Sequence, residues 1–288
     1  MPTEPINSLS ANESVETSVS EALEATSGQR YDHAKKAGNQ GDLVKHAALL
    51  AAVSYIAYRQ HCETFVYAES HAGPACHTLQ PGGAWEAGIG AFGRRVAGVD
   101  EADRRWPALH PYTATAFRHT PCAGSTYQGS HVLVHRMLTR ADVTPRMHLW
   151  DISSHVCADL RLRYRSEPGA HISRSDGYSG LAMLPYVDLA LVDAPAFEPR
   201  RIAQTIAGLS IKETPFLCWI PRIGVDSGED PVVREFRDLV AEDYFVGTAQ
   251  WQDWTPGLCG CAVVASPELQ EPLSAVMTEL LWAMGWRP

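Results

Sequence analysis

The sequence lacks the cysteine spacing of zinc-binding or disulfide-rich chains. Its cysteines are odd in number and scattered, and no Cys-x-x-Cys pair occurs among Cys62, Cys76, Cys122, Cys157, Cys218, Cys259 and Cys261. Four-thiolate zinc sites use closely spaced pairs, and disulfide frameworks are typical of short secreted chains. We therefore expect reduced cysteines, most of them buried and inert.

Positive charge and long apolar runs are also scarce. Lys and Arg number 24 against 33 Asp and Glu, which gives a formal net charge of −9. This balance argues against a broad phosphate-binding surface. The first basic residue is Arg30, and no apolar run of signal-peptide or membrane-spanning length precedes it. We expect no targeting or membrane segment and a cytoplasmic location.

The composition divides the chain into a leader and a folded part. Residues 1–30 are rich in Ser, Thr, Glu, Asn and Ala, which cannot offset the entropy of ordering, so we expect a disordered leader there. With 288 residues, 45% of them hydrophobic, the remaining chain can bury a sizeable core. We expect one α/β domain over residues 31–288.

Two elements open this domain. From Asp42, apolar residues follow helical spacing to about Arg59, and we predict Asp42 as the N-cap. Residues 64–69 (TFVYAE) are β-branched and aromatic, which predicts a strand. This strand ends at the turn 70–73 (SHAG), and open α/β sheets bind ligands at such strand ends.

Strands and helices alternate after residue 140. We predict strands over residues 147–151, 171–173, 187–193 and 216–220, and a closing hairpin from 244–251 and 261–265. Alternation of this kind indicates an α/β fold, with a mostly parallel sheet and helices on both faces. The segment of about 75–140 is longer than a simple α/β connection needs, and we interpret it as an inserted helical subdomain.

Three acidic residues follow successive predicted strands. Asp151 can accept two hydrogen bonds from a ribose, Asp176 can accept from an adenine amino group, and Gly177 lets a ring approach the backbone. The pattern favours an adenosine-bearing cofactor with Asp193 at its reacting end. The alternative interpretation is that each acid is a helix N-cap or a turn residue.

The first strand is not followed by a glycine-rich phosphate-binding fingerprint. Its turn offers only His71, Ala72 and Gly73, which does not support a pyrophosphate cradle. S-adenosylmethionine carries no phosphate and fits this turn better than a dinucleotide does.

Two pairs of side chains are assigned to packing rather than to chemistry. His131 and His135 lie four residues apart but lack the Glu of a His-Glu-x-x-His motif, so we place them on a helix surface and expect no metal site. Trp251 and Trp254 are interpreted as core or hairpin packing, not as a base-stacking platform.

Several motifs, in this order, resemble one family. They are the string 31–46 (YDHAKKAGNQGDLVKH), SHAG at 70–73, YQGS at 127–130, and DAPA at 193–196. The chain from about residue 31 to 286 resembles the RlmJ-type 23S ribosomal RNA adenine-N6 methyltransferases, which are class I S-adenosylmethionine-dependent enzymes with a Rossmann-like fold.

The resemblance implies two sets of site residues. Tyr31, His33 and Lys45 fall where the family meets its RNA substrate. The residues that match the S-adenosylmethionine site are His46, His71, Ser130, Asp151, Asp176, Gly177 and Asp193.

The sequence departs from the family at the acceptor motif. Where the family has Asp-Pro-Pro-Tyr, this chain keeps Asp193 and Pro195 but has Ala196 in place of the tyrosine that stacks on the base. Phe197 is the nearest aromatic residue and comes one position late. The acceptor pocket is therefore altered, whereas the cofactor pocket is largely kept.

Our leading hypothesis is an S-adenosylmethionine-dependent transferase that acts on a small amine- or hydroxyl-bearing molecule rather than on RNA. Asp193 would orient or deprotonate the acceptor, and His33 or Lys45 would place it or act as base. Tyr31, Pro195 and Phe197 would contact it.

Three alternatives stay open. One is the parent ribosomal RNA methylation, with a displaced aromatic stacker. Another is transfer or cyclisation of the aminocarboxypropyl arm of the cofactor. The last is a catalytically silent binding protein. The sequence leaves the oligomeric state open.

Overall fold

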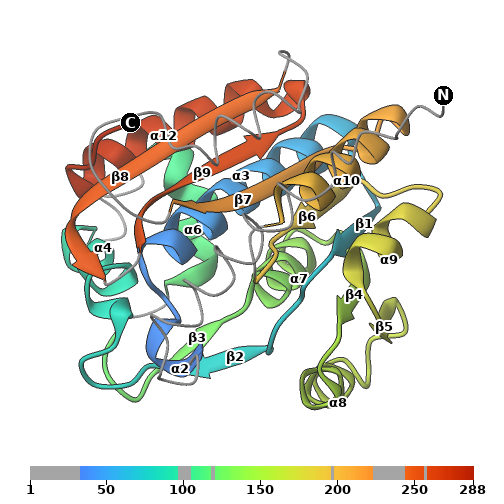
Figure 1. Ribbon diagram of the computed structural model, residues 1–288, viewed down its shortest axis with the longest axis horizontal. Helices are drawn as coiled ribbons and strands as arrows, with labels where there is room; N and C mark the ends of the chain where they lie inside the picture. The colour runs from blue at the N-terminus through green and yellow to red at the C-terminus, as the bar shows by residue number, and fades with distance from the viewer. Residues whose placement is uncertain (1–32, 97–104, 118–120, 196–197, 223–243, 256–257) are drawn as a thin grey trace, which may run out of the picture. The chain divides into compact units, whose positions relative to one another are not determined.

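The computed structural model describes residues 33–96, 105–117, 121–195, 198–222, 244–255 and 258–288 (Figure 1). Residues 34–288 form one compact unit, and residues 1–33 belong to another. The expected disordered leader lies outside the described residues, as do Tyr31 and Phe197.

A seven-stranded sheet forms the centre of the larger unit, in the order β5-β4-β1-β6-β7-β9-β8. Strands β1, β4, β5, β6 and β7 run parallel to one another, and β9 runs antiparallel to both of its neighbours. The predicted mostly parallel sheet is confirmed. The strands are β1 (Thr64–Glu69), β4 (Thr144–Asp151), β5 (Ala170–Arg174), β6 (Leu189–Val192), β7 (Phe216–Arg222), β8 (Phe245–Thr255) and β9 (Leu258–Ala265).

Side chains alternate between two cores along the central strands, as the period of two in a strand requires. Tyr67 of β1 belongs to one core, whereas the next residue, Ala68, belongs to the other. The first core is covered by α3 (Gln40–Gln60), α7 (Ser130–Arg140), α8 (Ser154–Arg163) and α12 (Gln270–Met284). The second core is covered by α9 (Gly177–Met183) and α10 (Pro199–Ile211) (Figure 1). The predicted helices on both faces are therefore present.

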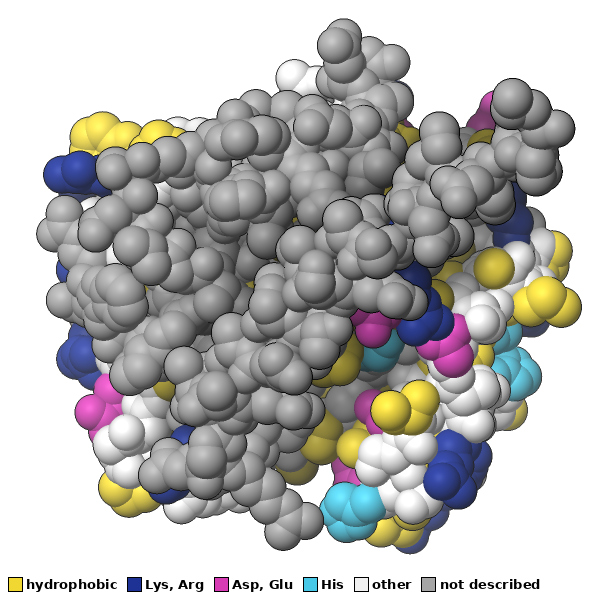
Figure 2. All heavy atoms as spheres, in the orientation of Figure 1, with side chains coloured by type: hydrophobic (Ala, Val, Ile, Leu, Met, Phe, Trp, Pro, Cys, Tyr) yellow, Lys and Arg dark blue, Asp and Glu magenta, His cyan; other side chains and the backbone are white. Residues whose placement is uncertain are grey.

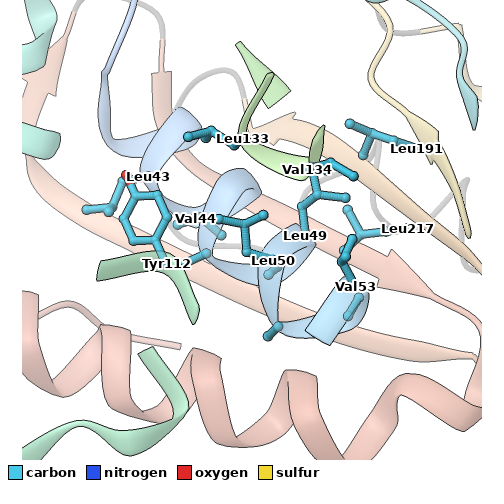
Figure 3. Close-up of a cluster of buried hydrophobic side chains, with 14 of the residues drawn as sticks. Leu43, Val44, Leu49, Leu50, Val53, Tyr112, Leu133, Val134, Leu191 and Leu217 are labelled. Atoms are coloured by element: carbon cyan, nitrogen blue, oxygen red, sulfur yellow. The ribbon is translucent and has the colours of Figure 1, made fainter. Parts of the chain in front are cut away.

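Helix α3 lies in the first core, with its leucines and valines packed against the sheet and against the neighbouring helices α6 and α7 (Figure 3). It begins at Gln40 rather than Asp42, so the predicted N-cap is wrong. Asn39 caps the helix, because its Oδ1 accepts from the Asp42 backbone N–H at 2.9 Å. The Asp42 carboxylate instead reaches back to the backbone N–H of Gly38 at 2.8 Å.

The segment predicted as a helical insertion contains both helices and strands. Two three-residue strands, β2 (Cys76–Thr78) and β3 (Thr126–Gln128), form a small antiparallel sheet that the sequence did not indicate. The helical elements are η1 (Ala84–Glu86), α4 (Ile89–Arg95), η2 (Pro107–Leu109), α6 (His110–Ala116) and α7. Helix α7 contacts both α3 and β4, so it belongs to the layer that covers the sheet.

The two histidines of α7 are buried, so their predicted place on the helix surface is wrong. His131 is fully buried, and its Nδ1 lies 2.8 Å from the Tyr164 hydroxyl. The ring of His135 also packs on Tyr164. Trp251 is buried against Trp286, in agreement with the packing interpretation.

The seven cysteines carry thiols rather than disulfides, and only Cys157, Cys218 and Cys261 are buried. The expectation that most are buried is wrong. Within the described ranges, no group of three or more His, Cys, Asp or Glu side chains is arranged to hold a metal ion. None of the helices described there combines the length and apolar character needed to cross a membrane.

Candidate functional site

The carboxyl ends of the parallel strands bring the predicted residues together. Glu69 at the end of β1 pairs in register with Leu149 of β4 and with Leu191 of β6. The ends of three neighbouring strands therefore lie level with one another. Asp151 and Asp193 follow these two partners by two residues each, at the edge where open α/β sheets bind ligands.

Asp151 organises the turn after β1. Its Oδ2 accepts from the Gly73 backbone N–H at 3.2 Å, and its Oδ1 accepts from the Ser153 N–H at 2.7 Å. Gly73 has a positive φ of 64°, which a residue without a side chain adopts readily. The SHAG turn is thus held by a side chain that the sequence assigned to a ribose.

Asp176 and Gly177 join α9 to the same turn. Asp176 caps α9 by accepting from the Ser179 backbone N–H at 2.9 Å. A Cβ atom on Gly177 would lie 1.5 Å from the Ser70 carbonyl oxygen, so only glycine allows α9 to approach the turn this closely. Gly177 therefore contributes by making this close approach possible.

The structure shows cap and turn roles for two of the three acids. Asp151 and Asp176 make the turn and cap hydrogen bonds that the alternative interpretation expected. A carboxylate carries about four lone-pair sites, so these bonds leave acceptor capacity for a ligand on each side chain. Their cofactor contacts stay a prediction.

Lys45 connects α3 to the end of β6. Its ammonium donates to Asp193 Oδ2 at 2.7 Å and lies 3.0 Å from Asp42 Oδ1. Burial by itself would lower the pKa of Lys45, but the charges of the two carboxylates outweigh burial and raise that pKa above its usual value. A lysine held in this way stays charged, which favours a placing role for Lys45 over the role of base.

An aromatic ring also lies at the acceptor end of the site. The Lys45 ammonium lies 5.5 Å from the ring centre of Trp219, on β7. In the part of the chain that the structure describes, Asp193 Oδ1 accepts no hydrogen bond, whereas Oδ2 is bound to Lys45. One oxygen of Asp193 is therefore free to accept from an amine or hydroxyl. Pro195, two residues further on, is exposed.

Glu69 is a site residue that the sequence reasoning missed. It is fully buried, accepting from the Tyr67 hydroxyl at 2.9 Å and from the Ser130 hydroxyl. Burial, followed by the charge of Asp193, raises its pKa to about 8 against the hydrogen bonds that lower it. An acid closing an otherwise apolar strand was the signal that could have identified it.

The two histidines predicted to bind the cofactor, His71 and His46, lie in different surroundings. His71 lies at the SHAG turn, with its ring 4.9 Å from that of Tyr178 and its Nδ1 2.8 Å from the Ser70 hydroxyl. His46 is buried, with Nδ1 2.5 Å from the Tyr127 hydroxyl, and burial followed by the charge of Lys45 lowers its pKa to about 3. His46 is therefore a neutral group in the interior. Of His33 the structure describes only the backbone, in α2 (His33–Lys36).

The visible surface carries mixed charge. Figure 2 shows Lys and Arg side chains interspersed with acidic and histidine side chains on the described part of the face in view. In the two ion-pair clusters beside the strand ends, carboxylates outnumber cations: Asp42 and Asp193 lie with Lys45, and Asp176 and Glu198 lie with Arg201. Such a site attracts a cationic ligand and repels phosphates.

The fold is shared with a solved structure. Protein LPL1258 from Legionella pneumophila, described as a DUF519 protein, superposes with a TM-score of 0.65 and 16% identity, covering 85% of this chain and 92% of its own. The predicted Rossmann-like methyltransferase fold is confirmed.

Further solved structures give lower scores. An rRNA methylase from Streptococcus thermophilus has a TM-score of 0.39 and 7% identity over 77% of this chain and 93% of its own. Fibrillarin from Aeropyrum pernix, solved with S-adenosyl-L-methionine bound, has a TM-score of 0.32 and 12% identity over 46% and 61%. No protein-family model matches the sequence, and no curated protein matches it. Membership of the RlmJ-type family stays a prediction.

Proposed function

We propose that the chain is an S-adenosylmethionine-dependent transferase whose acceptor is a small amine- or hydroxyl-bearing molecule. In this proposal the methyl group passes from the sulfonium of the cofactor to the acceptor, which loses a proton. The methyltransferase fold and the strand-end site around Asp151, Asp176 and Gly177 support the cofactor.

The observation that carries the choice of acceptor is the pairing of Lys45. Its ammonium lies between Asp42 and Asp193, so this cation is already neutralised and is a poor partner for an RNA phosphate. The free Oδ1 of Asp193 supports an acceptor that donates a hydrogen bond. The excess of carboxylates at the strand ends favours a neutral or cationic molecule over a polyanion.

Cofactor binding is tested first, by calorimetric titration of the full chain with S-adenosylmethionine and S-adenosylhomocysteine. We expect Asp151→Ala to abolish measurable binding, because the variant loses the ribose acceptor and releases the Gly73 turn. Asp159→Asn is the matched control: Asp159 accepts from the Ala75 N–H at 3.0 Å in the same loop but follows no strand end. Absence of binding by the folded wild type would refute the proposal.

The acceptor is tested by transfer of a labelled methyl group. Wild-type protein and Asp193→Ala are incubated with labelled cofactor and either a metabolite extract or ribosomal RNA. We expect label in the small-molecule fraction with the wild type and none with Asp193→Ala. Label only in RNA, weakening steeply as salt rises, would instead support the parent methylation.

A further inference from the structure

Arg201 of α10 connects three parts of the site. Its guanidinium donates from one nitrogen to Asp176 Oδ1 at 2.8 Å and from another to Glu198 Oε2 at 3.1 Å. The same group lies over the ring of Tyr178, 4.4 Å from its centre. Tyr178 in turn packs edge-on against His71 of the SHAG turn. Arg201 thus contacts residues that follow β5 and β6, and it is connected to the SHAG turn after β1 through Tyr178.

Three hydrogen bonds use most of the lone pairs of the Asp176 carboxylate. Oδ2 accepts from the backbone N–H of Ser179 at 2.9 Å and from its hydroxyl at 2.6 Å, which uses both lone pairs of that oxygen. Oδ1 accepts from Arg201, which leaves one lone pair on Oδ1 for a ligand. The group presented to a ligand is a single acceptor of fixed direction.

We propose that Arg201 is a positioning residue that sets the preference of the site for a 6-amino purine by fixing the Asp176 carboxylate. The inference rests on the proposed use of an adenosine-bearing cofactor and adds the residue that controls recognition of its base. A fixed, ionised carboxylate accepts from the adenine amino group and repels the carbonyl oxygen of a 6-oxo purine.

The surroundings of Arg201 suit this role. Burial by itself would raise the pKa of Asp176, but the Ser179 and Arg201 hydrogen bonds outweigh it and hold that pKa below its usual value. The planar guanidinium donates to two carboxylates from separate nitrogens in fixed directions while it lies over an aromatic ring, a geometry that an ammonium does not fix in the same way. Tyr178 is 6% exposed, so the ring that supports the guanidinium is itself fixed by packing.

The test compares two nucleosides that differ at one position of the base. The full chain is titrated calorimetrically with S-adenosylhomocysteine and with S-inosylhomocysteine, in which an oxygen replaces the 6-amino group. We expect the wild type to favour the amino compound by about tenfold to hundredfold, the value of one hydrogen bond to a charged group.

Arg201→Ala should reduce this preference to about threefold or less, because the Asp176 carboxylate is then held through Oδ2 alone and Oδ1 is no longer fixed in direction. Arg201→Lys should restore part of the preference, since it keeps one charged donor. Arg200→Ala is the matched control, because it removes the same charge from the preceding, exposed position of α10 and should leave the preference unchanged.

The outcomes test the role of Arg201 separately from the proposed function. Binding by the wild type with an unchanged preference in folded Arg201→Ala would overturn the role of Arg201 and leave the proposed function standing. A loss of affinity for both nucleosides in equal proportion would also overturn it, because that is the effect of a purely structural residue. No binding of S-adenosylhomocysteine by the wild type would overturn the proposed function and this inference together.

Discussion

Replacement of Glu69 by Gln tests the electrostatics of the strand ends. The Glu69 side chain is fully buried, and its pKa is raised to about 8, whereas an unperturbed glutamate has a pKa near 4.5. The folded protein therefore holds a proton on Glu69 that the unfolded chain releases at a lower pH. Stability that is fully present below about pH 4.5 is lost progressively as the pH rises to about 8. Glutamine resembles the protonated acid in shape and cannot ionise.

The size of the effect follows from the two pKa values. Each pKa unit corresponds to about 1.4 kcal/mol, so titration of Glu69 costs roughly 3 kcal/mol of stability between pH 4.5 and pH 7. The cost reaches about 5 kcal/mol at pH 8 and above. Glu69→Gln removes this cost. The variant should match the wild type near pH 4.5 and exceed its stability by an amount that grows with pH.

The assay is urea unfolding followed by circular dichroism at a series of pH values from acid to slightly alkaline. The quantity to compare is the difference in unfolding free energy between variant and wild type at each pH. Glu63→Gln makes the same chemical change on the exposed residue before β1 and serves as control. A difference that stays flat with pH for Glu69→Gln, as for the control, would show that the buried carboxyl is already ionised.

Three further substitutions address packing and charge. Lys45→Met should destabilise by about 1–3 kcal/mol in urea unfolding, because it leaves two partly buried carboxylates without their cation, and adding Asp193→Asn should recover part of the loss. No measurable loss would show that the ion pairs contribute as little as those on a surface. Gly177→Ala should lower the unfolding free energy by about 1–3 kcal/mol and weaken cofactor binding, because its Cβ would overlap the Ser70 carbonyl. An unchanged melting temperature and an unchanged binding titration would argue against that contact. Gly208→Ala should instead raise the unfolding free energy by roughly 0.5–1 kcal/mol, because an added Cβ on this residue of α10 would meet open space. A lower melting temperature would show that the space is not open.

The parts of the fold that the sequence predicted depend on local pattern. Strand β1 has the predicted bounds 64–69, because β-branched and aromatic residues end there at a turn that only a glycine-containing tetrapeptide makes. Helix α12 and the short strands β2 and β3 were not predicted. The strands are too short to show alternation, whereas the buried residues Leu273, Val276, Met277 and Leu280 of α12 follow helical spacing, so this helix could have been predicted from the sequence.

Gly177 shows how far a residue type can be interpreted from sequence. The sequence assigned this glycine to the approach of a ligand ring, which stays a prediction, whereas the structure shows that it allows α9 to approach the Ser70 carbonyl. Glu69 could have been noticed as an acid that ends an otherwise apolar strand, but its hydrogen bond from Ser130 could not be predicted, and neither could the contact of Arg201 with Asp176, because both join residues far apart in the chain. His131 was misplaced for the same reason: spacing along a helix does not reveal that Tyr164 offers a buried hydroxyl.

Asp193 and the position of the motif's tyrosine differ in what they indicate about the acceptor. Lys45 pairs with both Asp193 and Asp42, so loss of Lys45 leaves two carboxylates without a cation, whereas loss of either acid leaves one ion pair in place. Asp193 thus has a structural role as a partner of Lys45 whatever the acceptor is, and its presence alone does not argue for base methylation. In the RlmJ-type motif that the sequence resembles, a stacking tyrosine stands where this chain has Ala196, and an aromatic ring that serves only the acceptor can be replaced without breaking an ion pair. The identity of the acceptor is thus better inferred from the absent ring than from the retained acid.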